Sequence, residues 1–188
     1  MRCKDTIRIL VNLDRHKEQF RLKRKENITF FKRLKKTNPK KLDSIIHPIH
    51  DEVFECTDCL KCANCCKTTS PLFTTRDINR ISKHLGLTPQ ELEDDYLRRD
   101  SEEHFVLKST PCTFLGDDNY CSIYEIRPKA CREFPHTNRR RQHQLLDLTL
   151  KNTEVCPAVF EIVDKFFLKI FINYFIFFLL HLFYRFFI

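Results

Sequence analysis

Half of the cysteines in this chain, five of ten, fall within eleven residues in the pattern C-x-x-C-x-x-C-x-x-C-C, which spans residues 56–66. Thiolates two residues apart can bind one metal centre from a single tight turn, and thiolates far along the chain can complete its coordination. The pattern therefore predicts a metal site. The remaining cysteines of the central region are Cys112, Cys121, Cys131 and Cys156.

A disulfide framework and redox-active thiols are the alternatives to metal binding. The chain starts Met-Arg-Cys-Lys-Asp and soon becomes highly charged, so it lacks the apolar stretch of a signal peptide. We therefore expect a cytoplasmic protein, in which structural disulfides are rare. Adjacent Cys65 and Cys66 also make a strained disulfide pair, whereas both can bind metal without strain. These observations favour metal ligation.

The sequence contains none of the common nucleotide-binding or hydrolase motifs that we considered. The chain has two glycines, Gly86 and Gly116, and a dinucleotide-binding fingerprint or a P-loop needs several in one turn. Neither H-E-x-x-H nor G-x-S-x-G occurs. The sequence therefore assigns no reaction, and whether the protein is an enzyme stays open.

Basic charge is concentrated near the N-terminus. Residues 15–41 hold twelve Lys or Arg against two Glu, within a chain of net charge +8. We interpret residues 1–52 as a basic helical arm. It can contact RNA or an acidic partner, or it can be an amphipathic helix whose charges face water.

Helix signals dominate the rest of the chain. Capping-box spacings at Thr74 and Thr88 predict two helices, and further helices are expected around residues 145–150 and from Pro157. Pro48 predicts that the preceding helix restarts or bends. Short strands are expected at 105–107 and 120–124, and residues 56–66 are expected to be irregular. The sequence thus predicts a small, mainly α, metal-centred domain with cysteine-rich loops and at most a few short strands.

Residues 166–188 form a hydrophobic tail that contains nine of the eighteen phenylalanines. A membrane-spanning helix needs about 20 mostly apolar residues, so this tail predicts membrane contact. The alternatives are a core or partner-binding helix, or a segment foreign to the domain. Because every cysteine precedes Phe166, we expect residues 1–165 to fold and hold metal without the tail.

Several spaced motifs occur in order after the first cysteine cluster. They read C-x-x-C-x-x-C-C from Cys59, C-x-F-L from Cys112, C-x-I-Y-x-x-R-P from Cys121 and C-R-x-F-P from Cys131. In these motifs the chain resembles the YkgJ-type cysteine-cluster family, which is described as chelating zinc or iron. The resemblance covers about residues 53–165, and it implies a metal-binding domain there between the arm and the tail. Cys56 lies outside the family pattern.

The predicted ligands are thiols of this central region. All-sulfur ligation suits zinc and iron–sulfur clusters alike, and the crowding of thiols in C-x-x-C-x-x-C-C makes an iron–sulfur cluster the preferred cofactor. Cys156 precedes an expected helix start, where the helix dipole favours a thiolate. The predicted metal ligands are Cys59, Cys62, Cys65, Cys66, Cys112, Cys121, Cys131 and Cys156.

Other polar side chains near these cysteines are weaker candidates for a role at the metal site. Arg127 and Arg132 can donate to cluster sulfurs or hold an anionic substrate, and they can equally pair with nearby glutamates. His136 and His143 can bind metal, but surface or supporting roles are favoured because thiols are plentiful.

Two functional hypotheses follow. The first is a cytoplasmic metal-cluster protein, with iron–sulfur preferred and a redox or group-transfer role. The second is a zinc-stabilised nucleic-acid-binding or interaction module that uses the basic arm.

Overall fold

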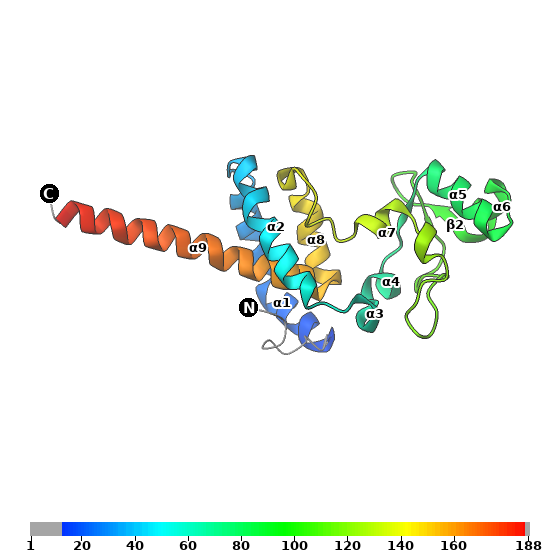
Figure 1. The fold of residues 1–188 in the computed structure, drawn as a ribbon, viewed down its shortest axis with the longest axis horizontal. Helices are drawn as coiled ribbons and strands as arrows, with labels where there is room; N and C mark the ends of the chain where they lie inside the picture. The colour runs from blue at the N-terminus through cyan, green and yellow to red at the C-terminus, as the bar shows by residue number, and fades with distance from the viewer. Residues whose placement is uncertain (1–12, 187–188) are drawn as a thin grey trace. The chain divides into compact units, whose positions relative to one another are not determined.

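The computed structural model of the chain describes residues 13–186. The protein is mainly helical with one small sheet, as the sequence predicts (Figure 1). It divides into two compact units: a helical unit, Met1–Thr57 with His136–Ile188, and a thiol unit, Asp58–Pro135. In chain order the elements are α1 (Leu13–Leu34), α2 (Pro39–Glu55), α3 (Cys59–Cys62), α4 (Asn64–Thr68), β1 (Leu72–Phe73), α5 (Thr75–Leu85), α6 (Pro89–Tyr96), β2 (Leu97–Arg99), β3 (Phe105–Leu107), η1 (Tyr124–Ile126), α7 (Lys129–Glu133), η2 (Gln142–Gln144), α8 (Leu146–Val155) and α9 (Pro157–Phe186).

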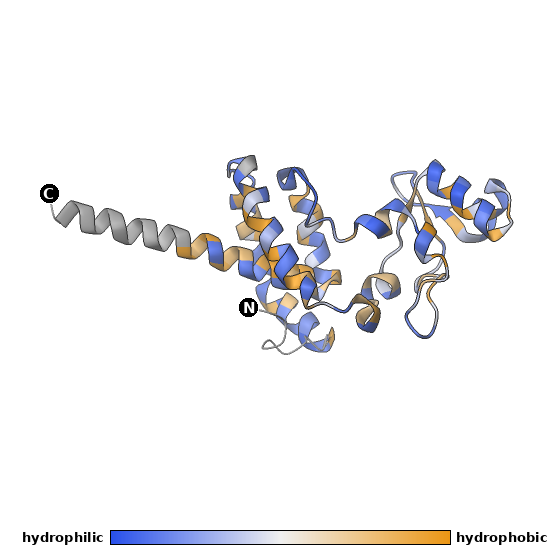
Figure 2. Cartoon of the chain, viewed as in Figure 1, coloured by the Kyte–Doolittle hydropathy of each residue, from blue (hydrophilic) through white to orange (hydrophobic). Residues whose placement is uncertain are grey.

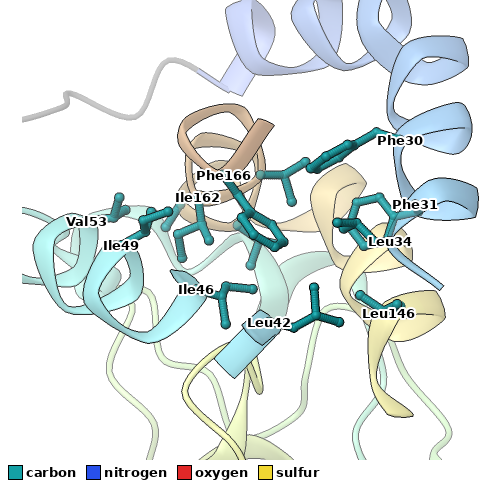
Figure 3. Close-up of a cluster of buried hydrophobic side chains, with 13 residues drawn as sticks. Phe30, Phe31, Leu34, Leu42, Ile46, Ile49, Val53, Leu146, Ile162 and Phe166 are labelled. Atoms are coloured by element: carbon teal, nitrogen blue, oxygen red, sulfur yellow. The ribbon is translucent and has the colours of Figure 1, made fainter. Parts of the chain in front are cut away.

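The helical unit packs α1, α2 and α8 around the first turns of α9. The Phe166 ring of α9 lies among core side chains, with Phe30 and Phe31 of α1 on one side and Ile46 of α2 on another (Figure 3). Its centroid is 5.5 Å from that of Phe30 in an edge-on arrangement. These helices form because each presents one apolar stripe to this shared core.

A hydrogen bond and an ion pair also join α1 to the other helices of this core. The His16 Nε2 atom is 2.9 Å from the Thr153 carbonyl oxygen, and Lys23 pairs with Asp164 at 2.5 Å. Most of the other basic residues of α1 face solvent. The N-terminal segment is therefore an amphipathic helix that belongs to a core, and contact with RNA or an acidic partner stays a prediction.

The link from the thiol unit back into the helical unit is fixed on α2. Asp43 accepts hydrogen bonds from the backbone N–H groups of Arg141 and Gln142 at 2.7 and 2.8 Å. Buried His50 lies 2.7 Å from the Thr137 hydroxyl. The Asp43 carboxylate thus satisfies two backbone N–H groups at the start of η2, and the His50 bond joins two side chains.

Of the two outcomes predicted at Pro48, the restart is wrong, because α2 runs through it without interruption, and a bend stays a prediction. Pro48 has no N–H to donate to the carbonyl of Ser44, four residues earlier. Both residues are exposed, so water can satisfy that carbonyl. The opposite face of α2 carries the buried Ile46 and Ile49, and this packing holds the helix together.

Two capped helices and a small sheet shape the thiol unit. Thr74 and Asp77 form a complete capping box on α5, and Gly86 ends the helix in the left-handed conformation. Thr88 and Glu91 form the same motif on α6. Both helices were predicted from these residues. Figure 2 shows that hydrophilic and hydrophobic residues alternate along α5.

The sheet has strand order β1-β3-β2 and is antiparallel throughout. The predicted strand at 105–107 is confirmed as β3, which pairs Val106 with Leu72 and with Arg98. The predicted strand at 120–124 is wrong: this stretch is a turn leading into η1, with a single bridge between Leu115 and Cys121. The core beside the sheet comprises Phe73, Ile78, Ile81, Leu92, Leu97, Leu107, Phe114 and Ile123.

The division into a basic arm, a metal-binding domain and a hydrophobic tail stays a prediction. Residues 136–165 pack with the N-terminal helices, and the Phe-rich segment starts inside that core because Phe166 is only 1% exposed. Among the described residues no helix is both long and apolar enough to cross a membrane. Membrane contact by the tail stays a prediction.

Candidate metal centre

The first cysteine cluster is built on two short helices, so the prediction of an irregular segment is wrong in part. The Asp58 carboxylate accepts hydrogen bonds from the N–H groups of Leu60 and Lys61, which starts α3 at Cys59. Buried Ala63 then adopts the left-handed conformation with φ of 45° and separates α3 from α4. This break turns the chain between Cys62 and Cys65, and the Sγ atoms of Cys65 and Cys66 lie 3.9 Å apart.

A tight hairpin brings Cys112 and Cys121 into the same region. The Cys112 N–H donates to the Cys66 carbonyl at 2.9 Å, which joins the hairpin to α4. The turn closes where the Gly116 N–H donates to the Tyr120 carbonyl at 2.8 Å. A Cβ atom at Gly116 would lie 2.8 Å from a carboxylate oxygen of Asp118, so a larger residue would displace this carboxylate, which accepts from the Tyr120 N–H.

In both hairpin motifs, C-x-F and C-x-I, a buried apolar residue follows the cysteine by two positions. Phe114 and Ile123, each two residues after a cysteine, are 6% and 3% exposed and anchor in the core of the thiol unit. Their backbone N–H groups donate toward the sulfurs of Cys112 and Cys121 respectively. Such bonds favour the thiolate that a metal requires. The apolar residue therefore fixes the backbone that supports each sulfur.

Cys131 joins this group from α7. Burial, followed by interaction with the thiolates of Cys66, Cys112 and Cys121, raises the pKa of Cys131 to about 12. Burial likewise raises the pKa values of Cys112 and Cys121, and nearby Cys66 adds to both effects. Four thiols are thus close enough to resist ionising together.

Cys66 is the thiol that the others share. The hydrogen bond with Cys65 lowers the pKa of Cys66 to about 7, against the effect of burial. Burial, and then the thiolates of Cys62 and Cys66 among other charges, raise the pKa of Cys59. Cys66 therefore interacts with thiols from both sides: Cys59, Cys65, Cys112, Cys121 and Cys131.

The structure places seven of the eight predicted ligands in the thiol unit and Cys156 in the helical unit. Cys156 lies between α8 and α9, where it packs against the helical core. None of these eight cysteines forms a disulfide, whereas Cys56 is disulfide-bonded. Across residues 13–186 no group of three or more His, Cys, Asp or Glu side chains is arranged to hold a metal ion.

The weaker candidates lie in different places. Arg127 stacks on the Tyr124 ring, 3.8 Å from its centroid, and its charge counteracts the raised pKa values of Cys121 and Cys131. Arg132 donates to the Arg127 carbonyl at 2.9 Å. His136 and His143 both belong to the helical unit.

Comparison with known families agrees with this concentration of thiols. Residues 58–157, just over half of the chain, match the family model CxxCxxCC, described as a putative zinc- or iron-chelating domain. The chain belongs to this family. The matched region of the CxxCxxCC domain starts at the first residue of the thiol unit and ends one residue after Cys156. No curated protein and no solved structure matches the chain significantly.

The donor set of this CxxCxxCC domain fits the metals that the family name gives. Thiolates are soft ligands that suit zinc and iron–sulfur clusters. Burial, and after it the neighbouring thiols, raise the pKa values of Cys59, Cys112, Cys121 and Cys131. A cation among the sulfurs would reverse this repulsion and deprotonate them.

The thiols of the metal-free protein should differ sharply in reactivity. Because the thiolate is the nucleophile, Cys66, with a pKa of about 7, should be alkylated by iodoacetamide at pH 7.5 well before Cys131, with a pKa of about 12. As the pH falls through 7, labelling of Cys66 should decline. Timed alkylation with peptide mass spectrometry measures both rates. Equal rates for the two residues in the folded protein would contradict this order.

Proposed function

We propose that the CxxCxxCC domain of this chain holds a polynuclear metal centre, with an iron–sulfur cluster preferred to zinc. The supporting observation is the concentration of seven cysteines in the thiol unit, where the Cys65 and Cys66 sulfurs lie 3.9 Å apart and the Cys112 N–H donates to the Cys66 carbonyl. A single zinc ion takes four ligands, so seven cysteines exceed what one zinc uses. Binding would draw the sulfurs closer together, and metal attraction would supply the driving force.

The proposed donors are the seven cysteines of the thiol unit. Cys66, Cys112, Cys121 and Cys131 form the group with mutual interactions, and Cys59, Cys62 and Cys65 precede it in α3 and α4. Cys156 belongs to the helical unit, and its role as a ligand stays a prediction, which the extent of the family match supports. When bound, an iron–sulfur cluster would supply one-electron chemistry or an open iron corner. A redox or group-transfer role of the protein rests on that chemistry.

Anaerobic purification followed by iron, zinc and labile sulfide analysis tests the proposal. We expect more than one metal per chain, with iron and sulfide in equal amounts. The oxidised protein should have a visible absorption band that dithionite bleaches. Several zinc ions without sulfide would overturn the iron–sulfur assignment and keep the polynuclear one. One zinc per chain would overturn both.

A further inference from the structure

Asp77 is a buried carboxylate of the thiol unit whose partners extend beyond its own helix. It is 2% exposed. One oxygen accepts from the Thr74 N–H and hydroxyl at 3.1 and 2.6 Å, within the capping box of α5. The other accepts from Arg80 at 2.8 Å and from the Lys129 N–H at 3.1 Å. That last bond reaches across 52 residues to the start of α7.

Arg80 binds the same distant segment from the other direction. Its Nη2 atom donates to the carbonyl oxygens of Ile126 and Arg127 at 3.1 and 3.0 Å. Together Asp77 and Arg80 contact the backbone on both sides of Pro128. Helix α5 therefore fixes residues 126–129, which connect the Cys121 hairpin to α7.

Helix α7 depends on this external support. It has five residues, and its N-cap, Pro128, provides no side-chain hydrogen bond. So short a helix is unstable alone, and the Asp77 carboxylate serves as its cap from another element. Cys131 is the third residue of α7, so the position of its sulfur depends on that cap.

We propose that Asp77 and Arg80 are positioning residues of the thiol centre, because they fix residues 126–129 and thereby hold Cys131 beside Cys66, Cys112 and Cys121. This inference rests on the proposed metal-binding function. Groups that orient ligands in this indirect way typically change metal affinity by about 10–100-fold when replaced.

The test compares two capping boxes in the same unit. Asp77→Asn removes a carboxylate that reaches Lys129, whereas Glu91→Gln removes one whose hydrogen bonds are within its own capping box. Metal affinity is measured by chelator competition, and folding by thermal unfolding of the metal-free proteins. We expect about 10–100-fold weaker metal binding for Asp77→Asn and no change for Glu91→Gln. Equal affinities for the two variants would overturn the proposal.

Two further measurements distinguish a positioning role of Asp77 and Arg80 from a loss of folding and from a failure of the proposed metal binding. Arg80→Lys retains the charge and one donor, so its affinity should lie between wild type and Arg80→Ala. Alkylation of Cys131 in the metal-free protein should be faster in Asp77→Asn than in Glu91→Gln. If wild type binds no metal, the proposed function fails, and the alkylation rates alone still decide whether Asp77 positions Cys131. Unchanged alkylation of Cys131 in Asp77→Asn would contradict that role.

Discussion

Replacing Cys66 with Ser is expected to abolish metal binding by the purified protein. Cys66 interacts with Cys59 on one side and with Cys112, Cys121 and Cys131 on the other. In the proposed polynuclear centre, loss of a thiolate shared in this way would affect the rest of the centre. Cys59→Ser is the matched control, because Cys59 is an exposed residue at the start of α3. This variant should keep part of the metal.

The fold should tolerate both replacements. Cys112 and Cys121 pack against the core of the thiol unit, whereas Cys66 and Cys59 are not among the residues of that core. Circular dichroism and thermal unfolding of the metal-free variants should therefore match wild type. Metal per chain, measured by elemental analysis after anaerobic purification, is the readout. Full metal content in Cys66→Ser would show that the other thiols suffice and that no shared ligand exists.

The cysteine spacing predicted which thiols to consider, but not how they group. Short-range chemistry is visible in a sequence, and the capping boxes at Thr74 and Thr88 predicted α5 and α6 for that reason. The grouping of Cys66 with Cys131 needs contacts over more than sixty residues, and no local pattern encodes them. The apolar residues of C-x-F and C-x-I did carry a signal: they anchor the N–H groups that support each sulfur.

Tertiary packing also explains where the predicted secondary-structure elements were wrong. Pro48 is a valid helix-breaking signal in isolation, yet the buried face of α2 outweighs one missing hydrogen bond. The aromatic residues at 120–124 suited a strand, but Tyr120 and Tyr124 are 57% and 49% exposed and only Ile123 is anchored. Asp77 is a further example: the sequence indicates its capping box, but it does not indicate its hydrogen bond with the N–H of the distant Lys129.

Loss of the Phe166 ring should destabilise the helical unit more than any other change at the start of the Phe-rich segment. Phe166 is 1% exposed, packs with Phe30, and lies beside residues of α1 and α2. Removing a buried phenylalanine side chain costs about 3–5 kcal/mol, and whole domains are stable by only about 5–15 kcal/mol. Phe166→Ala should therefore lose a large part of the free energy of unfolding.

Phe171 provides the matched control within the same helix. It is 62% exposed, so Phe171→Ala should change the free energy of unfolding by less than about 0.5 kcal/mol, as surface replacements usually do. Urea unfolding followed by circular dichroism measures both variants. Similar midpoints for the two would show that the core ends before Phe166.

The same reasoning decides where the chain can be shortened. A cut after Lys165 removes Phe166 together with Phe167 and Ile170, which pack against the helical core. A cut after Ile172 keeps all three. Against the expectation from the sequence that residues 1–165 fold without the tail, the first product should be unfolded or aggregated because it lacks the buried Phe166 ring. The second product should unfold cooperatively near the wild-type midpoint. If the chain cut after Lys165 stays folded, the Phe-rich segment is an appendage from its first residue, as its composition alone suggests, and the burial of Phe166 contributes little.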